Sequence, residues 1–349
     1  MVRIKIFALF ACSFFALVCT AQVNFQSPKD NPTELGKVNW LRSYDEALAL
    51  SKERNLPVFL LFQEVPGCSN CTRFGNGAIS DPFIVEAIES HFIPLAIFNN
   101  KKGEDARILA IYKEPSWNNP VVRIVNAKGE NITKRLSADL STTSVLNLVL
   151  EGIEKTSQET PAYLQLYSKE LKAKADAKEV NLAMYCFWTG EKEIAKIDGV
   201  ISTEAGFMDG REVVKVNYNE DEISLEELVS KADKAKCADV VYLQEDYDIS
   251  NLKKTSNGKS VKKSSAFRAD KEVKYYLSNS PYKFVPMIGI QQAKVNTALG
   301  EKKDPTAYLS PRQILLYKNL EKLEKKDLRN TVNSNFESHW YALLNEIKA

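Results

Sequence analysis

The feature that most constrains the fold of this chain is a continuous apolar run, LPVFLLF, over residues 56–62. Two cysteines, Cys68 and Cys71, follow it closely. An uninterrupted apolar run of this length is typical of a strand that is covered on both faces. Residues 40–55 before it have apolar side chains at helical spacing, with Ser43 as the predicted N-cap. The cysteine pair is therefore expected at the end of a buried strand in an α/β fold.

The segments after the cysteines continue the same pattern. DPFIVEAIES predicts a helix with Asp81 as its N-cap and Pro82 at the first helical position. FIPLAIF predicts a strand, and NPVVRIVNAKGENI predicts a hairpin with its turn at Lys128 and Gly129. STTSVLNLVLEGI predicts a closing helix. Together these elements predict one compact α/β domain over residues 35–155.

A second α/β unit is predicted over residues 179–250, after a charged helical connector at 156–178. EVNLAMYCFW predicts a strand that ends at Cys186, and EKEIAKID predicts a helix. Two strands around MDG, a helix opened by Ser224 and a last strand in CADVVYL follow. The order βαββαβ is the split-βαβ or ferredoxin-like arrangement. For residues 251–349 we expect a basic exposed loop up to 265 and a helical extension, with an amphipathic helical tail from residue 320.

The first 21 residues have the pattern of a secretory signal peptide. Arg3 and Lys5 precede an apolar stretch at 6–18, and small residues precede Gln22. A membrane-spanning helix needs about 20 apolar residues, so an uncleaved anchor is the less favoured alternative. We expect an exported protein, periplasmic or extracellular, with no membrane span after cleavage near Ala21.

The charge and the histidine content exclude several classes of function. The net charge is +2, which gives no reason to expect nucleic acid as a partner. The only two histidines, His91 and His339, are far from any other candidate ligand in the sequence. A histidine-based triad or metal site is therefore not expected, and no cofactor is indicated.

Leader removal would leave four cysteines, Cys68, Cys71, Cys186 and Cys237, too few for a disulfide-stapled fold. A zinc site needs four ligands, which the first pair lacks. A disulfide that closes over two residues restrains little chain entropy. A redox couple fits better, because a helix N-terminus lowers the pKa of the first thiol and the second thiol resolves the mixed disulfide.

Residues 40–135 resemble the thioredoxin superfamily, through the strand, the CxxC motif, the following helix and strand, and NNPVVRIV. The resemblance implies that Cys68 is the nucleophile, Cys71 the resolving thiol and Pro120 the cis-proline facing them. The VPGC lead-in is similar to thioredoxin-like proteins that carry selenocysteine at the first position. Gly67 stands where an aromatic residue is usual, the dipeptide SN lacks the usual proline, and PVFLLF contains no acid. The direction of thiol exchange and the reduction potential therefore stay open.

The motif YCFW contains the second candidate site, at Cys186. A lone cysteine beside aromatics is usually a buried small hydrophobic residue. Here it stands where a predicted strand meets a predicted helix, a position that lowers a thiol pKa. Phe187 and Trp188 could wall an apolar pocket, and Glu212 at the start of a neighbouring strand could donate a proton.

Residues 180–230 resemble A-type peptide methionine sulfoxide reductases, through YCFW, GVISTEAGFMDG and REVVKVNYNEDEISLEELV. The resemblance implies that Cys186 attacks the sulfoxide sulfur and becomes a sulfenic acid. It also implies that Phe187 and Trp188 hold the methyl group and that Glu212 protonates the departing oxygen. Cys237 is either a buried thiol at the start of a strand or the thiol that resolves the sulfenic acid.

This second resemblance has gaps. Tyr185 replaces the glycine before the cysteine, and the loop between the two central strands is too short to carry the family's tyrosine. Arg211 precedes the glutamate in place of the family's His-Ala pair, and the late Asp-and-Tyr motif is missing. The candidates to replace the tyrosine are Tyr242, Tyr247 and Tyr282.

The sequence as a whole predicts an exported thiol-disulfide oxidoreductase. Its expected partners are disulfide-containing or methionine-oxidised proteins and an external electron donor. A tether between the two units would give each an effective concentration on the order of millimolar toward the other, so the CxxC pair could reduce Cys186 in the same chain. The alternative is a redox domain fused to a catalytically dead module that binds substrates or a partner.

Overall fold

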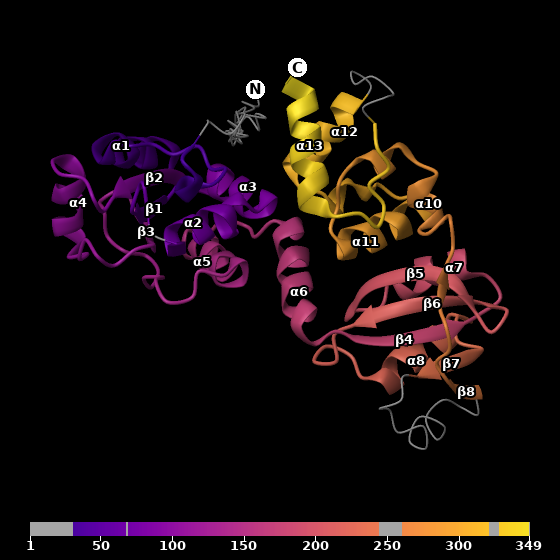
Figure 1. Cartoon of the computed structure of the whole chain (residues 1–349). Coiled ribbons are helices and arrows are strands. Elements are labelled where there is room, and N and C mark those ends of the chain that lie inside the picture. Colours follow the sequence, from indigo (N-terminus) through magenta and orange to yellow (C-terminus); the bar gives the residue numbers. More distant parts are fainter. Residues whose placement is uncertain (1–30, 68, 244–259, 321–327, 349) are drawn as a thin grey trace, which may run out of the picture.

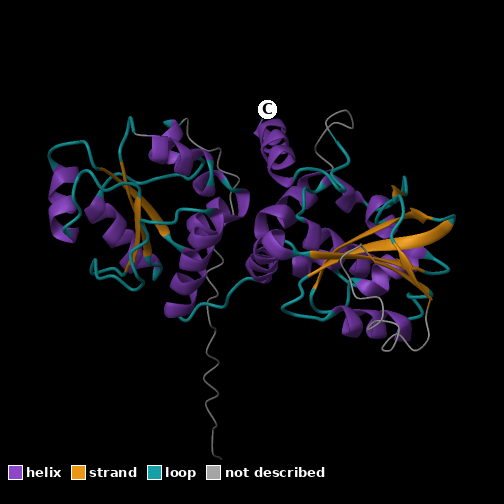
Figure 2. Cartoon of the chain, turned by 60° about the horizontal axis from the view of Figure 1, so that its bottom comes forward, coloured by secondary structure: helices purple, strands orange, loops and turns teal. Residues whose placement is uncertain are grey.

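The computed structural model describes residues 31–67, 69–243, 260–320 and 328–348. The leader 1–21 and Cys68 lie outside the described residues. Two α/β modules stand on either side of a group of helices, and each module has its own sheet (Figures 1 and 2). The mixed α/β fold class predicted from the sequence is confirmed.

The first module has a three-stranded sheet in the order β2-β1-β3. β1 is parallel to β2 and antiparallel to β3. The bounds of its strands and helices are β1 (Val58–Gln63), β2 (Ile93–Phe98), β3 (Val121–Val125), α1 (Tyr44–Arg54), α2 (Ser69–Asn76), α3 (Pro82–His91), α4 (Glu104–Tyr112) and α5 (Thr142–Lys155).

The central strand β1 is buried along its whole length, as the apolar run predicts. Phe59 and Leu61 pack in one core cluster, with residues of α3 and α5. Leu60 and Phe62 pack in a second cluster, with residues of α1 and α4. Successive side chains of a strand point to opposite faces, so the continuous run fills two cores at once.

Local capping signals define where the helices begin. The Ser43 side chain accepts a hydrogen bond from the Glu46 N–H at 3.3 Å. The Asp81 carboxylate accepts from the next two free N–H groups of α3, and Pro82 occupies the first turn. The predicted hairpin after β3 is reduced to single bridges, Val125 with Asn131 and Val122 with Leu136. The predicted hairpin turn at Lys128 and Gly129 is confirmed, because the Asn126 N–H donates to the Glu130 carbonyl across it at 2.9 Å.

The second module follows helix α6 (Ala162–Asp176) and has a six-stranded sheet in the order β8-β7-β4-β6-β5-β9. Its four central strands are antiparallel neighbours, so the predicted βαββαβ arrangement is confirmed. The bounds of its elements are β4 (Lys178–Ala183), α7 (Phe187–Ile194), β5 (Val200–Met208), β6 (Arg211–Tyr218), α8 (Leu225–Lys234), β7 (Val240–Leu243), β8 (Ser260–Lys263) and β9 (Arg268–Ala269).

Two expectations for this module were wrong. β4 ends at Ala183, before Cys186, and the next helix already begins at Phe187. Residues 260–263, expected in an exposed loop, pair as β8 with the edge of β7. Their side chains are mostly exposed, so the backbone pairing rather than burial holds them in the sheet. Residues 251–259 of the expected loop lie outside the described residues.

The C-terminal part contains the helices α10 (Tyr275–Ser278), α11 (Gly289–Gly300), α12 (Pro311–Asn319) and α13 (Phe336–Lys348). The expected amphipathic helical tail is confirmed over α13, whereas residues 328–335 before it are not helical. Asn330 and Asn335 in this stretch accept hydrogen bonds from nearby backbone N–H groups. The Asn330 bond is of a kind that competes with helix formation, whereas the Asn335 bond caps the first turn of α13.

The C-terminal helices join the two modules. On one side the Arg312 side chain pairs with Glu89 of α3, and the Tyr341 hydroxyl donates to the Ser80 carbonyl at 2.6 Å. On the other side the Thr297 hydroxyl donates to the Lys192 carbonyl of α7 at 3.1 Å. Among the described residues, no helix is both long and apolar enough to cross a membrane.

Candidate thiol redox sites

The first site is built around Cys71 in the first turn of α2. Its side chain is fully buried, and its Sγ donates a hydrogen bond to Oδ1 of Asn119 at 2.8 Å. The peptide bond between Asn119 and Pro120 is cis, as the resemblance to the thioredoxin superfamily implies. The structure therefore brings Cys71 and the cis-proline loop together. Cys68 lies outside the described residues, so its role stays a prediction.

The loop before the cysteines explains why Gly67 replaces the usual aromatic residue. A Cβ on Gly67 would lie 2.2 Å from the Glu64 carbonyl oxygen and 2.7 Å from the Cys71 Cβ. No side chain fits at this position without movement of the backbone. The Gly67 N–H donates to Oε1 of Glu34 at 2.8 Å, which ties this loop to the preceding segment.

Glu34 is an acidic residue beside this loop that the sequence did not predict. It belongs to the short helix η1 (Thr33–Leu35) and is nearly buried. A Cβ added to Gly67 would lie 3.1 Å from the Glu34 Cγ as well as 2.7 Å from the Cys71 Cβ. No motif in the sequence marks this residue, because it reaches the site from a segment that precedes α1.

Gln63, the last residue of β1, connects the same groups. Its Nε2 donates to the Glu34 carbonyl at 2.6 Å and to the Cys71 carbonyl at 3.1 Å. Its Oε1 is buried without a hydrogen-bond partner among the described residues. The Gln63 side chain thus connects the start of α2 to the end of β1, and its second bond to Glu34 holds it in place.

Three large hydrophobic side chains are strongly exposed among the described residues, and two of them are close in the chain to residues of the candidate sites. Trp117 is 81 % exposed and lies two residues before Asn119. Tyr185 is 93 % exposed and directly precedes Cys186. Exposed aromatic side chains of this kind are enriched where proteins bind other proteins.

The second site is built around Cys186, which directly precedes helix α7 and is half-buried. The Thr189 hydroxyl lies 3.6 Å from its Sγ. Oε2 of Glu212 accepts a hydrogen bond from the Phe187 N–H at 2.9 Å. The structure therefore brings the predicted thiol and the predicted acid to the same helix start.

Both predicted aromatic residues, Phe187 and Trp188, lie at this helix start, and a third aromatic residue, Tyr275, joins them. Phe187 is buried and packs edge-on against Phe207 at a centroid distance of 5.3 Å. Trp188 stacks on Tyr275 at 4.2 Å with an interplanar angle of 24°. Tyr275 belongs to α10, so one face of Trp188 is covered by the C-terminal extension. The sequence analysis missed this contact.

The tyrosines proposed as replacements are elsewhere. Tyr282 stacks on Tyr317 within the C-terminal helices, at a centroid distance of 3.9 Å. Tyr242 is buried on β7 in a cluster with Met208, separate from the cluster that contains Phe187. Tyr247 lies outside the described residues.

Cys237 lies just before β7 and is almost completely buried. Its Sγ donates to the Ala235 carbonyl at 3.2 Å. Burial raises the pKa of the Cys237 thiol to about 11, and the negative charges of Glu193, Asp239 and Cys186 act in the same direction. Among the described residues, no group of three or more metal-ligating side chains is present.

The two sites belong to opposite modules. Helix α2 lies in the first module and α7 in the second, with α6 and α11 between them (Figure 1). In this arrangement the thiol of Cys71 does not meet the thiol of Cys186. Transfer of electrons between them requires a movement of the modules or a diffusing carrier.

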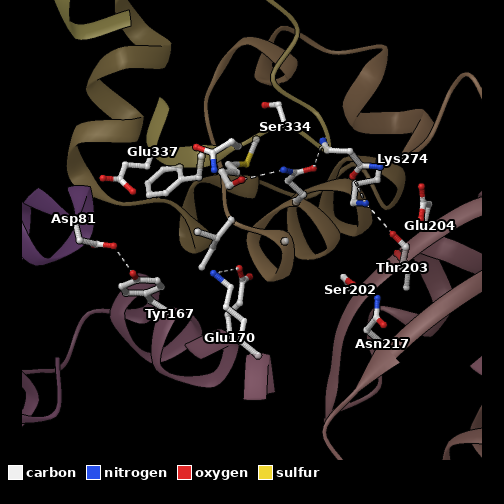
Figure 3. Close-up of a pocket in the computed structure, with 18 residues that line it drawn as sticks. Asp81, Tyr167, Glu170, Ser202, Thr203, Glu204, Asn217, Lys274, Ser334 and Glu337 are labelled. Atoms are coloured by element: carbon white, nitrogen blue, oxygen red, sulfur yellow. Dashed lines mark hydrogen bonds and ion pairs between the residues drawn. The ribbon is translucent and has the colours of Figure 1, made fainter. Parts of the chain in front are cut away.

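A cavity of about 530 Å³ lies between the modules (Figure 3). Its walls include Asp81, whose carboxylate accepts a hydrogen bond from the Tyr167 hydroxyl, and Glu170, which accepts one from a backbone N–H of α11. Burial raises the pKa values of Asp81, Glu170 and Glu337 there and lowers that of Lys274. Neither cysteine site opens into this cavity.

Comparison with known proteins finds similarity in two parts of the chain. A thioredoxin-like family model matches residues 39–127. Peptide methionine sulfoxide reductases MsrA from three strains of Clostridium perfringens are 39 % identical over 71 residues, covering 16 % of this chain and 45 % of each relative. The chain therefore spans less than half the length of these relatives.

Three solved structures are also similar to parts of the chain. Mxr1 from Saccharomyces cerevisiae, in an unusual oxidised form, has a TM-score of 0.25 at 22 % identity and covers 28 % of this chain and 78 % of its own. A thioredoxin from Thermus thermophilus has a TM-score of 0.29 at 20 % identity, with coverages of 33 % and 85 %. The DsbH oxidoreductase has a TM-score of 0.30 at 17 % identity, with coverages of 40 % and 96 %.

Proposed function

We propose that this chain, which joins a thioredoxin-like domain to a region similar to MsrA, is an exported thiol-disulfide oxidoreductase whose reactive pair is Cys68 and Cys71. The observation that supports this most is the environment of Cys71. Its buried thiol lies in the first turn of α2 and is bonded to the residue before a cis-proline. A thiol in this position is protected from solvent and suited to resolve a mixed disulfide at the neighbouring cysteine.

The proposed reaction is thiol-disulfide exchange with a client protein. The Cys68 thiolate attacks one sulfur of the client disulfide, and the other client sulfur leaves as a thiolate that takes up a proton. The Cys71 thiol loses its proton and attacks the Cys68 sulfur, which releases the second client thiol. The client disulfide has gained two electrons, and the pair has become a disulfide. An external dithiol returns the pair to the reduced state.

Several side chains of the first module have roles in this reaction. Asn119 accepts the hydrogen bond of the Cys71 thiol and so keeps its sulfur in one position. Gln63 holds the Cys71 carbonyl at the start of α2. The exposed Trp117 offers an apolar contact for a client chain beside the thiols. Client proteins with accessible disulfides are the proposed substrates.

Methionine sulfoxide reduction at Cys186 is the second candidate function. It is favoured by the hydrogen bond between the Glu212 carboxylate and the Phe187 N–H, which holds an acid beside the thiol. Cys186 would attack the sulfoxide sulfur while Glu212 protonates the oxygen, leaving methionine and a sulfenic acid on Cys186. The alternative is that this module is catalytically dead and binds a client or partner. It is supported by the stacking of Tyr275 over Trp188, the side chain proposed to hold the methyl group.

Two assays separate these functions. Insulin disulfide reduction with dithiothreitol as donor is expected for the wild type and for Cys186→Ser, and is expected to be lost in Cys68→Ser. Activity that persists in Cys68→Ser would refute the proposed reactive pair. Turnover of peptide-bound methionine sulfoxide that is lost in Cys186→Ser supports the second function. If the wild type shows no such turnover, or if the turnover survives in Cys186→Ser, sulfoxide reduction at Cys186 is excluded. The second module would then be the proposed binding module.

A further inference from the structure

The cavity between the modules has walls from parts of the chain that are far apart in the sequence (Figure 3). Asp81 comes from the start of α3 in the first module, and Glu170 comes from α6. Thr203 lies on β5 of the second module, and Glu337 lies in the first turn of α13. The volume of about 530 Å³ is within the range of pockets that hold small molecules, about 300–1,000 Å³. A ligand in this cavity would therefore contact both modules at once.

The cavity is lined by six charged side chains, Asp81, Glu170, Lys174, Glu204, Lys274 and Glu337. Half of them already have an ion pair. Glu170 lies 3.9 Å from Lys174, and Glu204 lies 2.6 Å from Lys215. The other three charged groups have no ion pair among the described residues. Of these three, the two carboxylates lie at one side of the cavity and the lysine lies at the other (Figure 3).

Asp81 and Glu337 form the acidic side of the cavity. The Asp81 carboxylate accepts hydrogen bonds from the Phe83 N–H at 3.0 Å and from the Tyr167 hydroxyl, but from no cation among the described residues. Burial raises the pKa of Glu337, and the negative charge of Asp81 acts in the same direction. The two carboxylates therefore repel each other, and a positively charged group between them would relieve that repulsion.

Lys274 forms the basic side. The residue is 2 % exposed, and its Nζ donates to the Thr203 carbonyl at 2.8 Å and to Oδ1 of Asn333 at 3.0 Å. An ammonium has three N–H donors, so one of them has no acceptor among the described residues. Burial lowers the pKa of Lys274, and the carboxylates of Glu191 and Glu204 offset this effect only in part. A buried charge bonded only to neutral oxygens is unfavourable, and an anionic group in the cavity would compensate it.

We infer that this cavity binds a short peptide, of about two or three residues, through both of its charged ends. The free amino group lies between Asp81 and Glu337, and the free carboxylate accepts a hydrogen bond from the Lys274 ammonium. Apolar side chains of the ligand contact Ile288 and Phe336, which line the same cavity. The bound peptide holds the two modules in the arrangement of this structure. The site does not depend on thiol chemistry, because neither cysteine site opens into the cavity.

The test is isothermal titration calorimetry of the full chain with trialanine as the probe. Trialanine is expected to bind the wild type. N-acetyl-trialanine and trialanine amide are each expected to bind about tenfold more weakly, because each lacks the charge at one end. Lys274→Met is expected to bind trialanine and its amide equally. Glu337→Gln is expected to reduce the preference for a free amino group.

Glu104→Gln is the matched control, because it removes an exposed carboxylate that does not line the cavity, and it is expected to leave all three affinities unchanged. Glu337 is exposed, so Glu337→Gln keeps the test decisive if Lys274→Met does not fold. A wild type that binds no trialanine at about 10 mM would overturn the inference. Equal binding of the free and capped peptides, or sensitivity to one end alone, would overturn it as well. So would a preference for free ends that neither variant alters.

Discussion

Glu114 holds the loop that presents Asn119 and Pro120 to Cys71, and its removal tests this arrangement. Its side chain is 1 % exposed and lies 2.6 Å from Nη2 of Arg123 and 2.8 Å from Nε of Arg135. Burial raises the pKa of Glu114, but its bonds with Arg135 and Arg123 outweigh that effect and hold the pKa below its ordinary value of 4.5. Glu114→Gln keeps the shape and removes the charge.

The expected loss of stability can be bounded from the contacts. Removing one partner of a fully buried ion pair costs about 3–5 kcal/mol, because the remaining charge is stranded. The side chains of Arg123 and Arg135 are 14 % and 30 % exposed and can regain water. The loss for Glu114→Gln is therefore closer to that of hydrogen bonds to a charged group, about 1.5–3 kcal/mol. Insulin reduction is expected to fall as well, because the loop carries the acceptor of the Cys71 thiol.

The assay is urea unfolding at several pH values, in which near-ultraviolet circular dichroism monitors the loss of tertiary structure in the first module. Because the folded pKa is depressed, the stabilisation by Glu114 is complete above about pH 4.5 and is lost as the pH falls through the folded value. The wild type and Glu114→Gln are thus expected to differ at pH 7 and to converge in acid. The matched control is Glu104→Gln, which breaks an exposed ion pair with Arg107 and is expected to leave the unfolding midpoint unchanged.

A difference at pH 7 smaller than about 0.5 kcal/mol would refute the structural role of Glu114, because a surface substitution alone has effects of that size. A difference that stays constant into acid would refute the electrostatic explanation. If stability falls as expected while the rate of insulin reduction is unchanged, the loop that Glu114 holds does not contribute to the reaction.

Three further predictions follow from other contacts. Burial raises the pKa of Glu86 to about 6, so the free energy of unfolding is expected to decline as the pH increases from 4.5 to 6. Glu86→Gln is expected to remove this decline when urea unfolding is compared at pH 5 and pH 7. A variant with the same pH profile as the wild type would contradict the raised pKa of Glu86. Gly67→Ala is expected to slow insulin reduction, because its Cβ would crowd the Cys71 Cβ at 2.7 Å; kinetics equal to the wild type would mean that the loop relaxes freely. When the chain is expressed with its natural leader in a secreting host, the exported protein is expected to start after Ala21. Mass spectrometry that finds the leader still attached to the exported protein would rule out cleavage after Ala21.

The separation of the two thiol sites alters the mechanism that the sequence suggests. A tether between a thioredoxin-like domain and a second thiol module predicts direct transfer within the chain. The C-terminal helices instead bond to both modules and lie between them (Figure 1). Direct transfer would require these contacts to break. A client or a small disulfide that visits each site in turn needs no such rearrangement.

The sequence by itself determined the elements that rest on local signals. The apolar run marked β1 as a strand covered on both faces, and Asp81 with Pro82 marked the start of α3. The order of strands and helices was enough for the βαββαβ sheet, whereas the cis-proline at Pro120 came only from the resemblance to the thioredoxin superfamily. These features depend on residues that are neighbours in the chain, where periodicity and capping chemistry act directly.

Only the tertiary structure decided what surrounds the thiols. Glu34 reaches Gly67 across 33 residues, and Tyr275 covers Trp188 across 87 residues. Cys186 and Cys237 lie near the same end of the neighbouring strands β4 and β7 because of the register of these strands. Contacts of this kind leave no periodic or capping pattern in the sequence. They arise because buried side chains must pack against segments that the chain brings together only when it folds.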